Sequence, residues 1–165
     1  MAVIVTGGTG KTSRLLVPML AEAKIPYVVT SRRGAEAFPA DFKNIAVKFD
    51  RTDASTYDAP FEAAKEPVKA IYIVSPEVPD PNPSTIAFIN HAYAKYGVKR
   101  FVQLAGGSVD PGKGFYGATW KHLLDLGVQS CALKPPWFNG EFSVEAPLYR
   151  QSPLCFLGYR VLTWR

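Results

Sequence analysis

The stretch VIVTGGTGKTSRLL, residues 3–16, joins a short apolar run to a glycine-rich turn and then to an apolar pattern of helical period. Its Gly10-Lys11-Thr12 segment matches the end of the phosphate loop of nucleoside triphosphatases. That loop needs another glycine five residues before Gly10, where this chain has Val5 inside the apolar run. Because Val5 replaces this essential glycine, the stretch does not fit the phosphate loop of a nucleoside triphosphatase.

The same stretch fits the turn of a dinucleotide-binding fold. Gly7 can make the tight turn, Gly10 lets the backbone approach a diphosphate, and Ser13 is small enough for helix and strand to pack closely. A helix that begins here offers free N–H groups and the positive end of its dipole to phosphate. The spacing predicts a dinucleotide site formed by Gly7, Gly8, Thr9, Gly10, Lys11 and Thr12.

The rest of the chain alternates short apolar runs with segments of helical period, which predicts an α/β fold with a doubly wound, parallel, Rossmann-type sheet in three layers. In the first helix we expect a kink at Pro18 and an apolar face that includes Met19. The predicted strands are Ala2–Thr6, Tyr27–Thr30, Ile45–Phe49, Ala70–Val74, Phe101–Leu104 and Ser130–Leu133.

The bulk composition of the 165 residues suits one globular domain, with 47% hydrophobic and 20% charged residues. The net charge of +5 is scattered along the chain, which argues against a nucleic-acid partner. No apolar run reaches the ~18 residues of a membrane span, and no leader precedes the first strand, so we expect a cytoplasmic protein without a membrane partner. Cys131 and Cys155 fit free thiols, and no metal site is expected.

The ends of the next strands indicate which dinucleotide binds. Arg32 and Arg33 follow the second strand, where an NAD site carries an acid, and they suit the 2′-phosphate of NADP. Asp50 ends the third strand and could either accept from the adenine amino group or cap the next turn. The segment Ser75–Ser84, with four prolines, follows the fourth strand and is either a rigid connector or a wall of the ligand crevice.

Together these features resemble the NmrA-like atypical short-chain dehydrogenases, and most closely the fungal ergot-alkaloid group of agroclavine and festuclavine dehydrogenases. The resemblance covers Ala2 to about Ser143. It is carried by the segments VTGGTGKTS, IPYVVTSRRG, AIYIVSPEVPDP, GVKRFVQLAGGSV, WKHLLDLGV and LKPPWFNGEFS.

The resemblance implies that a clavine-type iminium ion, a small-molecule alkaloid, is reduced by NADPH. It implies that the glycine turn, Arg32 and Arg33 bind the cofactor, with Ser75 and Pro76 beside its nicotinamide half. The same fold also includes non-catalytic redox-sensing regulators that bind dinucleotide. Quinone and isoflavone-type reductases share the fold as well, but match the sequence less closely.

The chain lacks the Tyr-x-x-x-Lys pair with which related enzymes reduce ketones. Trp120 stands at the lysine position after Tyr116, and Lys121 is one residue late, about 100° further around a helix. An iminium ion becomes a neutral amine on hydride addition and needs no proton donor. Tyr116 and Ser108 are therefore weak catalytic candidates, and Tyr116 fits a pocket wall or core residue better.

Two aromatic residues, Trp137 and Phe138, follow the sixth strand. They either face the substrate crevice and stack on an indole-bearing cation, or are packing aromatics of the core. His91 and His122 lie on predicted helices without a partner pattern and are interpreted as structural or exposed.

The resemblance ends near Ser143, which divides the chain into a nucleotide-binding domain, residues 1–143, and a divergent tail, residues 144–165. The family continues beyond this point into a long substrate-binding segment. We therefore expect a C-terminally truncated member with the substrate segment largely missing, impaired activity, and an apolar tail that favours self-association.

Overall fold

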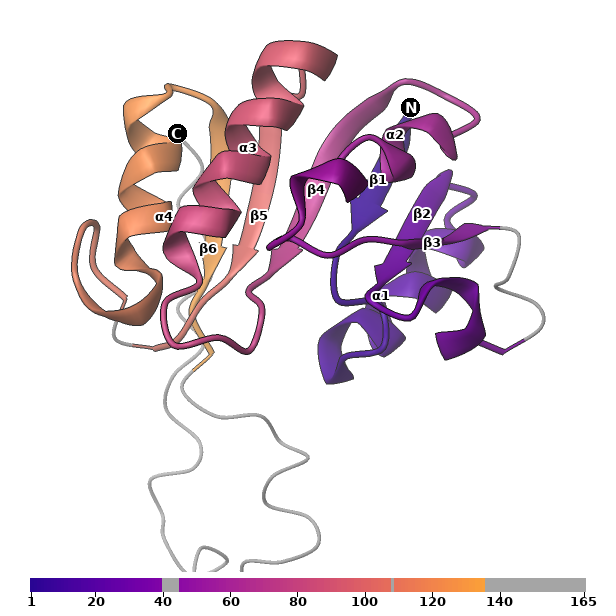
Figure 1. The fold of residues 1–165 in the computed structure, drawn as a ribbon, viewed down its shortest axis with the longest axis horizontal. Coiled ribbons are helices and arrows are strands. Elements are labelled where there is room, and N and C mark those ends of the chain that lie inside the picture. The colour runs from indigo at the N-terminus through magenta and orange to yellow at the C-terminus, as the bar shows by residue number, and fades with distance from the viewer. Residues whose placement is uncertain (40–44, 108, 136–165) are drawn as a thin grey trace, which may run out of the picture.

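The computed structural model describes residues 1–39, 45–107 and 109–135 (Figure 1). Within them six parallel strands form one sheet in the order β3-β2-β1-β4-β5-β6. The strands are β1 (Ala2–Val5), β2 (Tyr27–Ser31), β3 (Ala46–Lys48), β4 (Val68–Val74), β5 (Arg100–Leu104) and β6 (Gln129–Leu133). All six predicted strands are confirmed, with ends that differ by at most two residues.

Helices connect the strands and cover both faces of the sheet (Figure 1). They are α1 (Lys11–Glu22), α2 (Ala59–Glu62), α3 (Asn82–Tyr96) and α4 (Gly114–Asp125), with short 3-10 turns η1 (Gly34–Ala37) and η3 (Ala54–Thr56). The strand order reverses between β1 and β4, which makes this a Rossmann-type fold with its topological switch point at these two strands.

The core has two halves because successive side chains of a strand point to opposite faces. Ile4 of β1 packs with Phe88 of α3 and Leu123 of α4 on one face. Val5, the next residue, packs with Val17 of α1 on the other face. Both β1 side chains are fully buried, as expected for a strand in the middle layer of a three-layer domain.

Helix α1 runs through Pro18 without a break, so the proline does not end the helix. The expected apolar face was wrong at Met19, which is 64% exposed. The buried face consists instead of Ser13, Val17 and Leu20. The sheet selects this face because the small Ser13 must sit at the closest approach of helix and strand.

Candidate functional site

The glycine turn joins β1 to α1 at the carboxyl end of the sheet. Gly7 has a φ of +62°, a backbone conformation that residues with a side chain rarely adopt. The Gly10 N–H donates to the Gly7 carbonyl at 2.9 Å and closes the turn, while the Gly8 N–H donates to the Thr30 carbonyl of β2 at 2.8 Å. The turn thus has the tight geometry that the sequence predicts.

The first turn of α1 begins directly after Gly10, which provides no side-chain cap for its N–H groups. Ser13 is fully buried, and its hydroxyl donates to the Thr6 carbonyl at 3.3 Å. Thr12 is held by the Tyr72 hydroxyl, which donates to its Oγ1 at 3.0 Å, and Lys11 is exposed. The helix start therefore offers backbone donors and a positive dipole end to an anion.

Gly8 is required for a second reason that the sequence did not reveal. A Cβ atom at Gly8 would lie 2.8 Å from Cζ of Phe38 and 3.1 Å from Cβ of Val29. The Phe38 ring thus packs directly against the glycine turn on the α1 face of the sheet. Sequence spacing identified Gly8 as a phosphate-turn residue but gave no sign of this aromatic neighbour.

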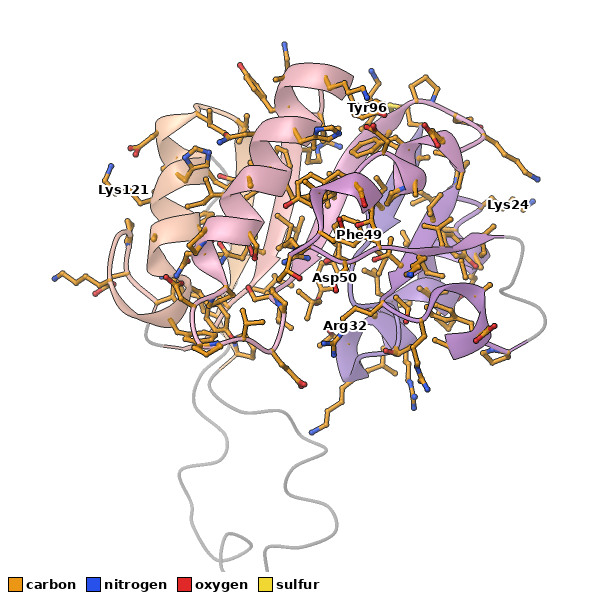
Figure 2. All side chains as sticks on the ribbon, viewed as in Figure 1. Lys24, Arg32, Phe49, Asp50, Tyr96 and Lys121 are labelled. Carbon is orange, nitrogen blue, oxygen red and sulfur yellow. The ribbon has the colours of Figure 1, made fainter. Side chains whose placement is uncertain are left out.

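Arg32, Arg33 and Asp50 lie at the carboxyl ends of β2 and β3, which are neighbouring strands. Both arginines are exposed, and Figure 2 shows Arg32 near Asp50. The pKa of Asp50 is lowered, first by hydrogen bonds from Thr52 and to a smaller extent by the charges of Arg32 and Arg51. Two exposed guanidinium groups beside a carboxylate can recognise a ribose that carries a phosphate.

Asp50 caps the turn that follows it, which confirms one of its two predicted roles. Its Oδ1 accepts from the backbone N–H of Thr52 at 2.9 Å and from the Thr52 hydroxyl at 2.7 Å. The capping fixes the carboxylate at the end of β3. Contact with an adenine amino group stays a prediction.

Four buried side-chain atoms of the described residues have no hydrogen-bond partner: Thr30 Oγ1, Arg51 Nε, Ser75 Oγ and Gln103 Oε1. They belong to β2, to the residues that follow β3 and β4, and to β5, in each case at or near the carboxyl end of the strand. Buried polar atoms are nearly always paired with protein, water or ligand, so four orphans along one edge make this edge a candidate site for a polar ligand.

Arg51 is the functional candidate that sequence reasoning missed. Its side chain is 5% exposed and bonds Thr6 Oγ1 at 2.8 Å and Thr85 Oγ1 at 3.2 Å. In the sequence it lies among ordinary polar residues after β3, and a lone arginine in a loop most often faces solvent. Nothing in the local pattern could have predicted its burial.

The proline-rich segment after β4 is tied to α4. Asn82, at the start of α3, donates to the Phe115 carbonyl at 2.9 Å and accepts from the N–H and hydroxyl of Thr119 at 3.1 and 2.9 Å. Ser75 and Pro76, at the beginning of the segment, are half-buried. These contacts fasten the last part of the segment to α4 at the carboxyl edge, where it can serve as a wall.

Tyr116 and Lys121 do not form a proton-donating pair in α4. The ammonium of Lys121 pairs with the Asp125 carboxylate at 2.6 Å on the exposed side of the helix (Figure 2). The half-buried Tyr116 packs edge-on against Phe115, and its carbonyl accepts from Gln103 Nε2 at 3.2 Å. The prediction that Lys121 cannot replace the missing lysine agrees with this geometry.

The remaining candidates fall into two groups. Ser108, Trp137 and Phe138 lie outside the described residues. His91 and His122 have polar partners, the Asp58 carboxylate and the Asn90 side-chain oxygen, each at 2.7 Å, which fits a structural role.

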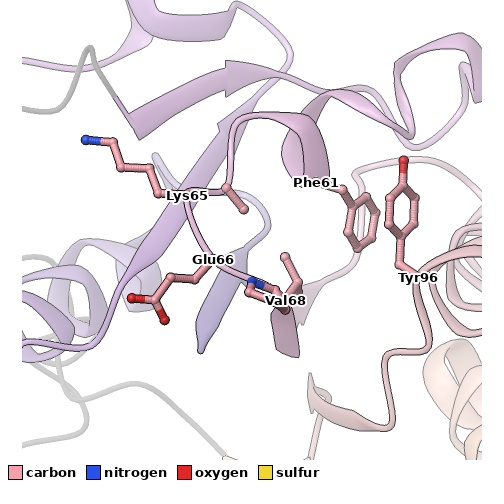
Figure 3. Close-up of a pocket in the computed structure, with 7 residues that line it drawn as sticks. Phe61, Lys65, Glu66, Val68 and Tyr96 are labelled. Carbon is pink, nitrogen blue, oxygen red and sulfur yellow. The ribbon is translucent and has the colours of Figure 1, made fainter.

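A cavity of about 350 Å³ lies at the opposite, amino end of the sheet (Figure 3). It is lined by residues before and at the start of β4, including Glu66 and Val68, and by the stacked rings of Phe61 and Tyr96. Its mouth is far from the glycine turn in the fold, because β4 begins here and ends beside that turn. The cavity is therefore separate from the candidate cofactor site.

Within the described ranges, no group of acidic, histidine and cysteine side chains is arranged to hold a metal ion. The helices of the same ranges include none that is long and apolar enough to cross a membrane.

Comparison with known proteins places these features in context. No family model matches the chain. Agroclavine dehydrogenase of Claviceps fusiformis is 35% identical over 146 residues, which are 87% of this chain and 49% of that protein. Festuclavine synthase II of Penicillium roqueforti is 37% identical over 144 residues, which are 84% of this chain and 48% of that protein.

Solved structures share the fold. Triphenylmethane reductase of Citrobacter, complexed with NADP(H), superimposes with a TM-score of 0.67 at 18% identity and covers 88% of this chain and 53% of its own. An NADPH-dependent quinone oxidoreductase of Escherichia coli superimposes with a TM-score of 0.65 at 23% identity, and the match covers 88% of this chain and 51% of the oxidoreductase. The chain spans about half the length of the curated relatives it matches.

Proposed function

We propose that this chain, a homologue of the fungal agroclavine and festuclavine dehydrogenases, is the nucleotide-binding part of an NADPH-dependent reductase of a clavine-type iminium ion. The names of the relatives supply the substrate class, a small-molecule alkaloid, and the residues at the carboxyl edge support the cofactor. The proposed nucleotide-binding domain extends to residue 143, with residues 144–165 as a separate tail. A cytoplasmic location is part of the same proposal.

The observation that carries the cofactor assignment is the set of unpartnered polar atoms along the carboxyl edge of the sheet, where the glycine turn also lies. The turn and the uncapped start of α1 would hold the diphosphate through backbone N–H groups. Gly7, Gly8, Thr9, Gly10, Lys11 and Thr12 form this part of the site. The hydroxyl of Ser75 and the ring of Pro76 would lie beside the nicotinamide half, at the end of β4.

Arg32 and Arg33 favour NADPH over NADH. Their guanidinium groups are exposed at the end of β2, the position that faces the adenosine ribose in this fold. A guanidinium can bind a phosphate through two parallel hydrogen bonds, and a second one beside it adds further charge. Asp50, fixed by its own turn, is the proposed partner of the adenine amino group.

When bound, NADPH supplies a hydride. The protein's own task is to hold the two reactants in line and to exclude water, because reduction of an iminium ion requires no proton transfer. The absence of a required proton donor agrees with helix α4, in which Lys121 forms an ion pair with Asp125. Tyr116 and Ser108 are at most auxiliary catalytic groups, and Trp137 and Phe138 are the proposed aromatic walls for the cationic substrate.

The decisive experiment is thermal melting of the purified chain alone, with NADPH and with NADH. A ligand that binds the native state stabilises it by about 2.7 kcal/mol at a hundredfold excess over Kd. We expect NADPH to raise the melting temperature well beyond NADH. A cooperative melt that neither dinucleotide shifts would contradict the cofactor assignment.

Oxidation of NADPH in the presence of a clavine iminium ion then separates a reductase from a non-catalytic binding module. A redox-sensing module would bind the dinucleotide without consuming it. Because the chain spans about half of its relatives, a slow but substrate-dependent oxidation would already support the proposal.

A further inference from the structure

Arg51 crosses from the end of β3 to the switch point between β1 and β4. Its Nη2 donates to Thr6 Oγ1 at 2.8 Å, and Thr6 immediately precedes Gly7 of the phosphate turn. The Thr6 hydroxyl also donates to the Tyr72 carbonyl at 3.0 Å and accepts from the Val74 N–H at 2.9 Å, which ties β1 to β4. The guanidinium is therefore anchored on the residue that joins the two switch-point strands.

The other contacts of Arg51 are also neutral. Nη1 donates to Thr85 Oγ1 in the first turn of α3 at 3.2 Å, and Nε has no hydrogen-bond partner. Among the described residues, no carboxylate forms an ion pair with this guanidinium, and the neighbouring Asp50 carboxylate is bonded to Thr52 instead. The positive charge is thus buried among hydroxyls and over the Phe49 ring, 5.9 Å from the guanidinium carbon to the ring centre, and the described residues place no counter-ion in contact with it.

Burial of such a charge is costly, because the surrounding protein replaces water poorly as a solvent for an ion. The cost is visible in the pKa of Arg51, which burial lowers to about 10 although Tyr57 and Asp50 counteract the change. A neutral side chain of similar length could fill the same space and avoid this penalty. The position therefore makes physical sense if an anion binds nearby.

We propose that Arg51 is a positioning residue of the cofactor site, whose buried charge holds Thr6 under the phosphate turn and favours an anionic ligand at the switch point. The identity of that ligand as a dinucleotide rests on the proposed function. The chemistry that the charge recognises is the diphosphate, which NADPH and NADH share. Arg51 should therefore set affinity for both dinucleotides, whereas Arg32 and Arg33 should set the preference between them.

The test compares Arg51→Met and Arg51→Gln with the wild-type chain, since glutamine keeps an amide donor for Thr6 while removing the charge. Arg51→Lys keeps the charge, and Arg32→Ala is the matched control at the ribose end. Melting curves and binding isotherms are recorded with NADPH, with NADH and with inorganic pyrophosphate, at two salt concentrations.

We expect the neutral variants to melt at or above the wild-type temperature without ligand and to bind both dinucleotides about tenfold more weakly. That is the scale of one charge acting across several ångströms of protein at an effective dielectric constant of about 20. The NADPH-to-NADH affinity ratio should stay unchanged, and the salt dependence of binding should become shallower. Arg51→Lys should stay within about threefold of wild type, while Arg32→Ala should change the ratio.

Wild-type affinity in the neutral variants would overturn the proposal, as would an affinity loss confined to NADPH. If neither neutral variant folds, the side chain is needed for the fold itself and the proposal is also wrong. In another outcome, the wild-type chain binds pyrophosphate, the neutral Arg51 variants bind it more weakly, and neither dinucleotide binds. That result would support the inference about Arg51 and refute the proposed cofactor. A wild-type chain that responds to none of the three probes would refute both.

Discussion

At the amino end of the sheet, the carboxylate of Asp58 accepts hydrogen bonds from three side chains, whereas at the carboxyl end Arg51 is buried without a carboxylate in contact. The donors to Asp58 are His91 at 2.7 Å, Lys95 at 2.8 Å and Tyr96 at 2.7 Å. Among the described residues, Arg51 bonds two threonine hydroxyls, lies over the Phe49 ring and keeps one orphaned nitrogen. The more exposed charge is the better satisfied of the two.

This difference separates an edge held together by its own side chains from the edge that we propose binds the cofactor. At the amino end, Asp58 pins the start of α2 to the last turns of α3, and the stacked rings of Phe61 and Tyr96, 3.8 Å apart, complete the contact. At the carboxyl end, four buried polar atoms in or just after β2, β3, β4 and β5 have no hydrogen-bond partner among the described residues, which is the condition that a bound cofactor would relieve.

The largest expected effect concerns the preference between dinucleotides. Replacing Arg32 and Arg33 together by alanine should weaken NADPH binding about 100-fold, because each charge-assisted bond to a phosphate contributes about 1.5–3 kcal/mol. NADH binding should change little, and so should the melting temperature without ligand, since both side chains are exposed. Titration of the double variant with each dinucleotide measures this.

The matched control is Lys24→Ala with Arg100→Ala, two exposed cations at the amino end of the sheet. This pair changes the net charge equally but should leave NADPH affinity within about threefold, because exposed charges at this distance are screened. Equal losses in both double variants would mean that bulk charge, and not the end of β2, governs the affinity.

Much of the fold was predictable from the sequence because β strands in a doubly wound sheet are buried on both faces. Such strands are short, continuous apolar runs, and each of the six could be recognised from composition alone. The glycine turn was equally visible, since Gly7 needs a positive φ and Gly10 closes the turn. Each of these features depends on residues that are close together in the sequence, so the sequence pattern is enough to predict it.

What the sequence could not predict depends on contacts between distant residues. Met19 fits an apolar helical face, yet the sheet packs against the neighbouring stripe through Ser13 and Val17. The burial of Arg51 depends on Thr6 and Thr85, which are 45 and 34 residues away. The packing of Phe38 on Gly8 likewise joins separate segments, and no spacing rule encodes it.

Glycines at the two edges give the next comparison, because Gly7 and Gly97 have nearly the same φ, +62° and +65°. Each alanine variant should lose about 1 kcal/mol of stability from backbone strain. Gly7→Ala should lose more, since the added Cβ would lie 3.2 Å from Cβ of Val74, whereas nothing lies within 4 Å at Gly97. Denaturant unfolding measures both losses.

Cofactor binding should separate the same two variants completely. Gly7→Ala distorts the phosphate turn and should reduce the thermal shift with NADPH, while Gly97→Ala should keep the full shift once its lower starting temperature is taken into account. An equal loss of binding in the two variants would show that the glycine turn has no special role and that general destabilisation is the cause.

The Asp58 cluster predicts a contribution to stability that is lost in acid. The pKa of Asp58 is held well below its ordinary value by hydrogen bonds from Lys95, Tyr96 and His91. The resulting stabilisation is present above the unfolded pKa, about 3.9, and is lost as the pH falls through the lower folded value. Asp58→Asn should melt lower at pH 7 and lose this part of the acid dependence.

The control for Asp58→Asn is its NADPH affinity at pH 7, which should equal that of the wild type because Tyr96, which bonds Asp58, lies at the other end of the sheet from Arg32 (Figure 2). Melting curves between pH 7 and about pH 2 provide the measurement. An unchanged acid transition in the variant would remove Asp58 as the source of that stability. A fall in NADPH affinity would contradict the separation of the two edges.

The smallest effect is expected from the replacement of Lys121. This lysine is one residue away from the position that the Tyr-x-x-x-Lys pattern requires, so its variant tests whether the reaction needs a proton donor. Its ammonium forms an exposed pair with Asp125 one helical turn away, so Lys121→Ala should cost less than about 0.5 kcal/mol of stability. NADPH affinity and any iminium-dependent oxidation of NADPH should stay at the wild-type level, as they should in the matched control Asp125→Ala. A loss of turnover in Lys121→Ala alone, with binding intact, would mean that this lysine leaves Asp125 to act on the reactants, and that the reaction depends on a proton after all.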